Sequence, residues 1–292
     1  MGAKRFGAIE AGGTKWVCAI GDESGELVET ETFPTTTPDE TIGRAAAFLA
    51  EGGPLAALGV GCFGPVDVHR SSQTWGHITT TPKPGWANTD VAPRLGELLG
   101  TRVAFDTDVN AAAVGEQLRG AAVGLETFAY ITVGTGIGAG IVVGGRVHHG
   151  LTHPEFGHMR VPHWPDDPFP GSCPFHGDCL EGLASGESLR QRWSRPAEEI
   201  DDDVAWQIEA RYLAAGIVNL ICTLSPQRVI IGGGVLKQPA LLPLIRTHVD
   251  ALLAGYVAAP ELVEPACGRD AGVLGALELA RRFVSSDRGS GG

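Results

Sequence analysis

The feature that most constrains this fold is a pattern of short strands and glycine turns that occurs twice, about 120 residues apart. The predicted strands are residues 6–9, 16–20 and 27–33 in the first copy and 128–133, 137–143 and 146–149 in the second. Each copy has a Gly/Thr turn after its first strand. The repeat predicts two similar α/β lobes, each presenting a glycine hairpin to the space between them.

Further helices and strands fit this two-lobed arrangement. Thr37, Pro38 and Glu40 supply an N-cap, a proline at the first helical position and a capping-box glutamate for a helix that ends near residue 50. Additional strands are predicted at residues 58–61, 102–105 and 229–231, and helices at 109–122, 186–193, 203–224, 239–254 and 271–283. We expect an N-terminal lobe of residues 1–108, a C-terminal lobe of residues 109–270, a helix at 271–284 that packs back on the first lobe, and a disordered tail at 285–292.

The charge balance excludes several classes of partner. The chain has 22 basic and 34 acidic residues and a formal net charge of −12, which argues against nucleic acid or an anionic membrane as the main partner. Residues 1–15 lack the apolar stretch of a signal peptide, and no run of about 20 apolar residues occurs. We therefore expect a soluble, cytoplasmic protein whose six cysteines are thiols or metal ligands rather than disulfides.

Glycines gather at three places that suit phosphate or nucleotide binding. The first cluster follows a strand and comprises Glu10, Gly12, Gly13, Thr14 and Lys15. Backbone N–H groups in such a turn can hold phosphate oxygens, and Lys15 can add positive charge. An ordinary glycine hairpin is the alternative interpretation. The turn is neither a Walker A loop nor a Rossmann loop, because GxxxxGK[ST] is absent and no helix follows.

The second and third clusters lie in the predicted second lobe. Gly134, Thr135 and Gly136 repeat the chemistry of the first hairpin, which makes coincidence a weaker explanation. A third run, Gly232, Gly233 and Gly234, follows a buried strand and would let a flat adenosine group approach the backbone closely. A loop without ligand is the alternative for this third run.

Two carboxylates stand where a strand ends and a helix begins. Asp106 and Asp108 are followed by Asn110, a combination that suits a general base with supporting polar groups. The alternative is that both acids cap the helix. Asp108, directly before the predicted helix, is the candidate base, and Asp106 is the natural control.

A spaced set of sulfur and imidazole ligands predicts a metal site. Cys173, His176 and Cys179 are separated by two residues each, and His158 can complete a tetrahedral set that favours Zn²⁺. Because protein would fill all four positions, we expect a structural ion that orders residues 153–182. A surface loop with free thiols is the alternative.

Taken together, these motifs resemble the ROK family of repressors, open reading frames and sugar kinases, and most of all its bacterial fructokinases. The resemblance covers residues 9 to about 280. It implies an actin-like, ribonuclease-H-like ATPase fold of two lobes and a homodimer. Two variants are similar to the fructokinase branch, namely Glu10 in place of aspartate and His176 in place of cysteine. No helix-turn-helix precedes residue 6, so the repressors match poorly.

The resemblance also implies roles for individual residues. Asp108 matches the catalytic base, and Thr107 its sugar-holding neighbour. The other matches to positions that contact the sugar are Gly64, Thr80, Thr81, Glu155, His158 and Glu181. His158 would in addition bind zinc.

The resemblance implies an ATP-dependent hexose kinase that uses Mg-ATP, with Mg²⁺ bridging the phosphates and fructose 6-phosphate as product. Asp108 would accept the proton of the attacking hydroxyl. Mannose, glucose or a broad range of hexoses remain alternative acceptors, because hydroxyl geometry is not visible in a sequence. A catalytically inactive sugar sensor is the alternative from another class.

Overall fold

The computed structural model describes residues 4–289 and divides the chain into two compact units. The first unit contains the described residues of 1–123, 147–153 and 266–292, and the second contains residues 124–146 and 154–265. Each unit has a five-stranded sheet. The chain thus crosses between the units four times. The sequence predicts two crossings, at residues 108 and 270.

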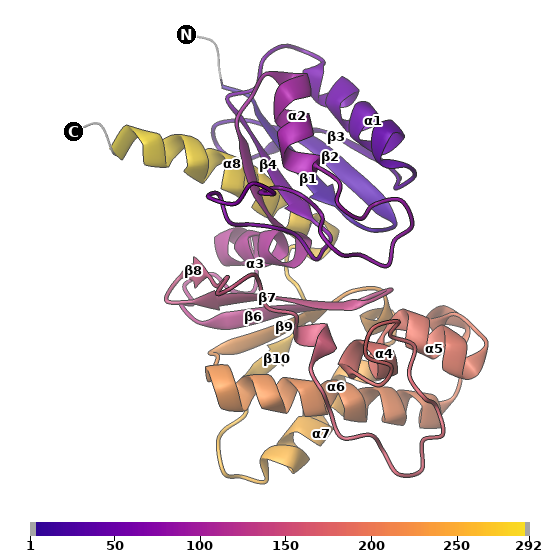
Figure 1. The fold of residues 1–292 in the computed structure, drawn as a ribbon. Helices are drawn as coiled ribbons and strands as arrows, with labels where there is room; N and C mark the ends of the chain where they lie inside the picture. The colour runs from indigo at the N-terminus through magenta and orange to yellow at the C-terminus, as the bar shows by residue number, and fades with distance from the viewer. Residues whose placement is uncertain (1–3, 290–292) are drawn as a thin grey trace. The chain divides into compact units, whose positions relative to one another are not determined.

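The first unit is built on a sheet in the order β3-β2-β1-β4-β5 (Figure 1). Its strands are β1 Phe6–Ala11, β2 Lys15–Gly21, β3 Leu27–Pro34, β4 Ala57–Cys62 and β5 Val103–Thr107. Strands β1, β2 and β3 form an antiparallel meander, and β4 and β5 add to β1 in parallel. The helices are α1 Pro38–Ala50, α2 Val91–Leu99, α3 Asp108–Arg119 and α8 Ala271–Gly289.

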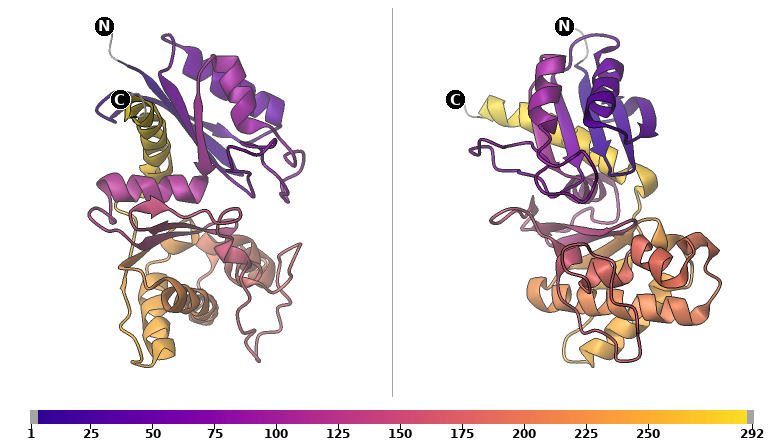
Figure 2. Two further views of the ribbon diagram at one scale, coloured as in Figure 1. Left: turned by 60° about the vertical axis from the view of Figure 1, so that its left-hand side comes forward. Right: turned by 45° about the vertical axis from the view of Figure 1, so that its right-hand side comes forward.

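Small residues let helix α8 lie directly on α3, as the left-hand view of Figure 2 shows, and on strands β1 and β4 of the sheet. A Cβ atom added at Gly275 would lie 1.6 Å from the carbonyl oxygen of Ala111, and one at Gly59 of β4 would lie 1.8 Å from that of Ala276. These contacts confine both positions to glycine. The same contacts explain why α3 belongs to the first unit. From the sequence, we expect residues 109–122 in the second unit.

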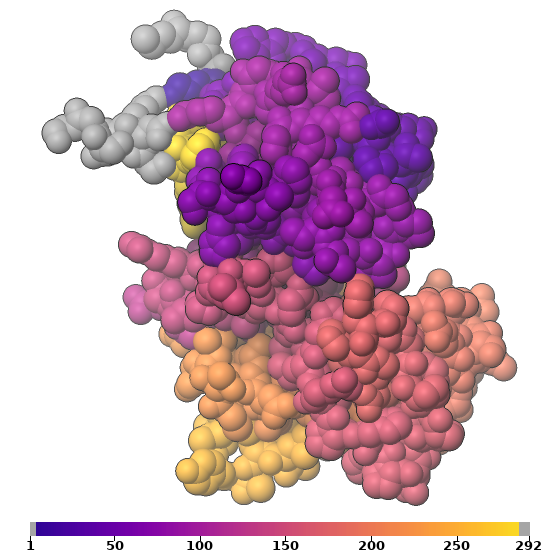
Figure 3. Space-filling view, in the orientation of Figure 1, coloured from indigo at the N-terminus to yellow at the C-terminus, as the bar shows by residue number. Residues whose placement is uncertain are grey.

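The second unit repeats this plan with a sheet in the order β10-β9-β6-β7-β8. Its strands are β6 Phe128–Val133, β7 Ile137–Val143, β8 Arg146–Val147, β9 Arg228–Gly232 and β10 Glu261–Val263. Its α-helices are α4 Leu180–Ala184, α5 Gly186–Trp193, α6 Asp203–Leu224 and α7 Leu241–Leu253, and it has 3₁₀ turns at Phe156–His158, Ala197–Glu199 and Val235–Lys237. The space-filling view shows part of residues 154–185, in pink, on the surface of this unit (Figure 3).

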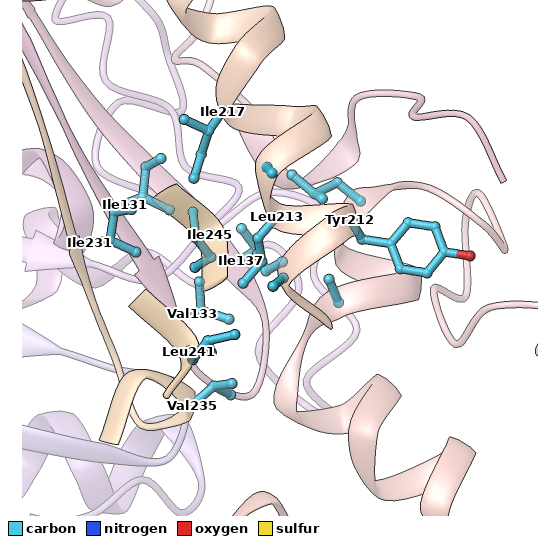
Figure 4. Close-up of a cluster of buried hydrophobic side chains, with 14 of the residues drawn as sticks. Ile131, Val133, Ile137, Tyr212, Leu213, Ile217, Ile231, Val235, Leu241 and Ile245 are labelled. Atoms are coloured by element: carbon cyan, nitrogen blue, oxygen red, sulfur yellow. The ribbon is translucent and has the colours of Figure 1, made fainter. Parts of the chain in front are cut away.

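The core of the second unit lies between its sheet and helices α6 and α7. Ile131 and Ile231 from the sheet face Ile217 of α6 and Ile245 of α7 (Figure 4). All four side chains are almost completely buried. Burying one such side chain stabilises the fold by roughly 1.5–3 kcal/mol, so this layer holds the ends of β6 and β9 in place.

Read from β3 and from β8, the two sheets have the same strand order, and β6 pairs antiparallel with β7 and parallel with β9, as β1 does with β2 and β4. This confirms the predicted internal duplication. The structure also contains α2, α4 and β10, which the sequence did not predict. Helix α8 continues to Gly289, where a disordered tail was expected at residues 285–292, and residues 290–292 lie outside the described part.

Two further expectations concern the cysteines and the membrane. All six cysteines are free thiols, and two of them, Cys173 and Cys179, belong to the predicted metal site. Among the described residues, none of the helices combines the length and the apolar character that spanning a membrane requires.

Candidate active site

The hairpin between β1 and β2 presents backbone groups at the end of the first sheet. The N–H of Gly12 donates to the carbonyl of Lys15 at 3.0 Å, and the hydroxyl of Thr35 donates to the carbonyl of Gly12 at 2.7 Å. These bonds close a tight turn. The side chains of Thr14 and Lys15 are exposed, so both can reach a ligand.

Asp108 is the first residue of α3, at the end of the neighbouring parallel strands. Its side chain is half-buried, and its Oδ1 atom accepts a hydrogen bond from the N–H of Val109 at 2.9 Å. The N-cap of this helix is Thr107, whose hydroxyl accepts from the N–H of Asn110 at 3.1 Å. A threonine therefore fills the capping role that the alternative interpretation gave to the two acids.

Burial changes the acidity of both carboxyl groups near the hairpin. It raises the pKa of Asp108 to about 6. The pKa of Glu10, at the end of β1, rises to about 7, chiefly through burial and then through the charge of Asp108, while Lys15 opposes the shift. A carboxylate with a pKa near neutrality can both lose and accept a proton at physiological pH, as a general base must.

A long loop after β4 carries the predicted sugar-side positions of the first unit. Gly64 lies two residues after β4, and Thr80 and Thr81 follow in the same loop with exposed and half-exposed side chains. Trp86 anchors this loop, because its ring packs at 5.4 Å from that of Phe63 and its Nε1 donates to the carbonyl of Thr36 at 2.8 Å.

The second glycine hairpin joins β6 to β7 and contacts two helices. The N–H of Gly134 donates to the carbonyl of Gly136 at 2.9 Å, and the N–H of Gly186 in α5 donates to the carbonyl of Gly134 at 2.7 Å. The N–H of Ile137 donates to Oε2 of Glu181 in α4 at 2.9 Å. Thr135 is exposed at the tip. The hairpin is therefore fixed directly to one of the predicted sugar-binding side chains.

The triple-glycine loop after β9 lies beside this hairpin. Gly233 has a φ of +101°, and a Cβ atom there would lie 2.3 Å from the carbonyl of Val133, the last residue of β6. Gly232 ends β9, while Gly233 and Gly234 are exposed. The second unit thus brings together two of the three predicted glycine clusters.

Four predicted metal ligands of the second unit converge. The ligand atoms of His158, Cys173, His176 and Cys179 all lie within 4.8 Å of one another and could hold a metal ion. The Nδ1 atoms of His158 and His176 are 3.2 Å apart, and the Sγ atoms of Cys173 and Cys179 lie 3.7 and 3.6 Å from Nδ1 of His158. Tetrahedral zinc, with bonds of about 2.0–2.1 Å to nitrogen and 2.3 Å to sulfur, requires separations of roughly 3.3–3.8 Å. The spacing fits.

The other face of His158 points toward two carboxylates. Its Nε2 atom lies 4.0 Å from Oε2 of Glu155 and 3.9 Å from Oε1 of Glu181. A ligand imidazole whose second nitrogen faces carboxylates is the usual arrangement around protein-bound metals. The predicted sugar-binding trio of Glu155, His158 and Glu181 is therefore one cluster next to the metal ligands.

Sequence reasoning missed two histidines of the first unit, His149 and His153, and the contact that His149 makes with Asp106. Asp106 is buried, and its Oδ2 atom lies 2.8 Å from Nε2 of His149. Nε2 of His153 accepts a hydrogen bond from the N–H of Val66 at 3.1 Å, next to the loop that carries Gly64. Both histidines lie in the segment 147–153, where the chain returns to the first unit. No local sequence motif predicts this return.

Comparisons with known proteins agree on one family. A sequence model of the ROK family matches residues 6–283. The chain is 41% identical over 290 residues to the fructokinase of Zymomonas mobilis, covering 95% of this chain and 96% of that protein. The crystal structure of a ROK hexokinase from Thermus thermophilus has a TM-score of 0.79 and 30% identity, covering 97% and 99% of the two chains. A ROK family glucokinase from Streptomyces griseus, in complex with glucose and AMPPNP, has a TM-score of 0.78 and 28% identity, covering 96% and 100%.

Proposed function

Because the chain belongs to the ROK family, we propose that it is an ATP-dependent fructokinase that converts D-fructose to fructose 6-phosphate. The observation that carries this proposal is the 41% identity to a fructokinase over nearly the full length of both proteins. The two-sheet fold matches a family hexokinase with a TM-score of 0.79, which supports ATP-dependent carbohydrate kinase activity.

Fructose is favoured over glucose by the pattern of similarity. Identity falls from 41% with the Zymomonas mobilis fructokinase to 29% with the glucokinase of Streptomyces coelicolor, which is matched over 94% of this chain. The Glu10 variant and the spacing of Cys173 and His176 point to the same branch. Specificity among hexoses is a ratio of kcat/KM values, so competing acceptors must be compared on that scale.

The site residues suit phosphoryl transfer, which depends mainly on positioning and on neutralising charge. We propose that the N–H groups of the two glycine hairpins and Lys15 hold the phosphates of Mg-ATP, and that Gly232, Gly233 and Gly234 accommodate adenosine. Asp108 accepts the proton from the C6 hydroxyl. With a pKa of about 6, this carboxyl is largely ionised at neutral pH and is a stronger base than an exposed aspartate.

We further propose that the four converging ligands hold zinc in a structural role. Thiolate and imidazole ligands in a closed tetrahedral set favour this ion over harder cations. The ion would tie the loop of Cys173 and His176 to the turn of His158 and the start of α4. Glu155, His158 and Glu181 then lie on an ordered surface that can bind hexose hydroxyls.

A coupled ADP-release assay with fructose and Mg-ATP tests the proposal. We expect turnover with fructose and a lower kcat/KM with glucose and mannose. A higher kcat/KM with glucose contradicts the fructose preference and leaves the kinase activity standing, whereas sugar binding without ADP release supports the sensor. The resemblance also implies a homodimer, and light scattering, which measures the molar mass in solution, tests this prediction.

A further inference from the structure

Asp106, two residues before Asp108, has a carboxylate with three hydrogen-bonding partners. It is 5% exposed. Its Oδ1 atom accepts hydrogen bonds from the N–H of Thr107 at 2.8 Å and from Nδ2 of Asn110 at 2.6 Å, and its Oδ2 atom lies 2.8 Å from Nε2 of His149. A buried carboxylate needs such partners to remain ionised. One side chain therefore ties the last peptide of β5, the first turn of α3 and a distant histidine together.

His149 reaches Asp106 because residues 147–153 return to the first unit. Two more histidine contacts fasten this segment there. Nε2 of His69 lies 2.7 Å from the carbonyl of Leu151, and Nε2 of His153 accepts from the N–H of Val66 at 3.1 Å. His149 is thus held from both sides and can restrain Asp106, in addition to being restrained by it.

These bonds fix the backbone on both sides of Asp108. On one side, the N–H of Thr107 donates to Oδ1 of Asp106. On the other side, Nδ2 of Asn110, in the first turn of α3, donates to the same oxygen. Asp108 lies between these two fixed points. Three of about four acceptor positions on Asp106 are occupied, which leaves Asp106 itself poorly suited to receive a substrate proton.

We propose that Asp106 and His149 form a positioning pair that aims Asp108 at the acceptor hydroxyl, an inference that rests on the proposed kinase function. The pair requires His149 to donate its Nε2–H. Hydrogen bonding to Asp106 raises the pKa of His149 above its usual value, which agrees with a donated proton. Removing the donor leaves Oδ2 of Asp106 buried without this partner, and the turn of Asp108 loses its support.

Three variants test the pair. His149→Leu removes the donor, and His149→Gln keeps an N–H near the position of Nε2 without the charge. The adjacent, exposed His148→Gln is the matched control. Because a misplacement of about 1 Å can cost on the order of 100-fold in rate, we expect His149→Leu to lower kcat by roughly 10- to 100-fold. The KM for Mg-ATP should stay within about twofold, since this substitution leaves the phosphate hairpins intact.

The conservative variant separates positioning from general destabilisation. His149→Gln should recover kcat to within about threefold of the wild type, and His148→Gln should match the wild type. Hydrogen exchange of peptides covering residues 105–112 should be faster in His149→Leu alone, a readout that needs no turnover. Unchanged kcat and unchanged exchange in His149→Leu overturn the proposal, as does a glutamine variant that is as slow as the leucine variant.

The kinetic arm uses whichever hexose the wild-type enzyme phosphorylates. A wrong acceptor assignment therefore changes the substrate in the assay and leaves the comparison among variants intact. An inactive wild type contradicts the proposed function, and in that case the exchange measurement alone decides whether His149 orders the start of α3.

Discussion

At the scale of the residue, Asp108 combines partial burial with a position at the start of a helix, and both follow from its place directly after β5. Asp108→Asn keeps the size and the hydrogen bond to the N–H of Val109 but cannot take up a proton. We expect kcat to fall by roughly 10²–10⁴, the usual effect of losing a general base, with little change in nucleotide affinity. Steady-state kinetics and nucleotide titration measure the two quantities.

The structure changes which variant serves as the control for this experiment. Asp106 is buried and makes three hydrogen bonds, so Asp106→Asn is not neutral. Asp90→Asn is a better match, because Asp90 is exposed and precedes helix α2 without a side-chain capping bond. An Asp108→Asn enzyme as active as Asp90→Asn shows that another group is the base.

The raised pKa of Asp108 predicts a pH dependence. The carboxyl accepts a proton only when ionised, so kcat/KM should fall about tenfold per pH unit below a pKa of about 6 and level off above it. Glu10, with a pKa of about 7, is the other carboxyl group that could cause this fall of kcat/KM at low pH, the acidic limb of the pH profile. The limb should persist in Glu10→Gln; its disappearance there assigns the titration to Glu10.

At the scale of the element, the hairpin between β6 and β7 depends on a close approach to α4. A Cβ atom at Gly136 would lie 2.5 Å from Oε2 of Glu181, where that oxygen accepts from the N–H of Ile137. Gly136→Ala should therefore push Glu181 away and raise the KM for the hexose several-fold. Gly134→Ala is the matched variant, because its Cβ has open space. Equal hexose KM values for the two variants contradict this contact as the cause.

Glu116 in α3 holds two loops that lead into the second unit. Its carboxylate is completely buried and accepts from the backbone N–H groups of Ala121, Ala266 and Cys267 at 2.6, 3.1 and 2.8 Å. Glu116→Gln turns one acceptor oxygen into a donor that faces other donors, at a cost of about 1–3 kcal/mol. We expect a lower melting temperature than for the exposed control Glu97→Gln. Equal melting curves contradict the role of Glu116.

At the scale of the whole molecule, a bound metal should link folding to hexose binding. Protein purified without added metal should contain about one zinc per chain. A chelator, or Cys173→Ser, should remove the metal, lower the melting temperature and abolish hexose binding, because His158 belongs to both clusters. Elemental analysis and calorimetric titration with fructose measure these effects, and Cys222→Ser, an exposed cysteine outside the cluster, is the control. Full hexose affinity in metal-free protein contradicts the link.

Much of this architecture could be predicted because its signals are local. The strands of both meanders follow from apolar runs broken by glycines, and Thr37 and Pro38 mark the start of α1 as observed. The four candidate metal ligands could be found because three of them are close in sequence. Short elements such as α4 and β10 were missed, since their few residues carry no clear periodicity.

The sequence by itself determined the duplicated strand pattern, the glycine hairpins and the four candidate metal ligands, because each depends on residues near one another along the chain. Only the tertiary structure decided that Asp106 pairs with His149 and that Glu181 bonds to the hairpin at Ile137. It also decided that α3 joins the first unit through its packing on α8. The physical reason is that such contacts depend on how separate elements pack, and packing joins residues whose spacing along the chain carries no periodic signal.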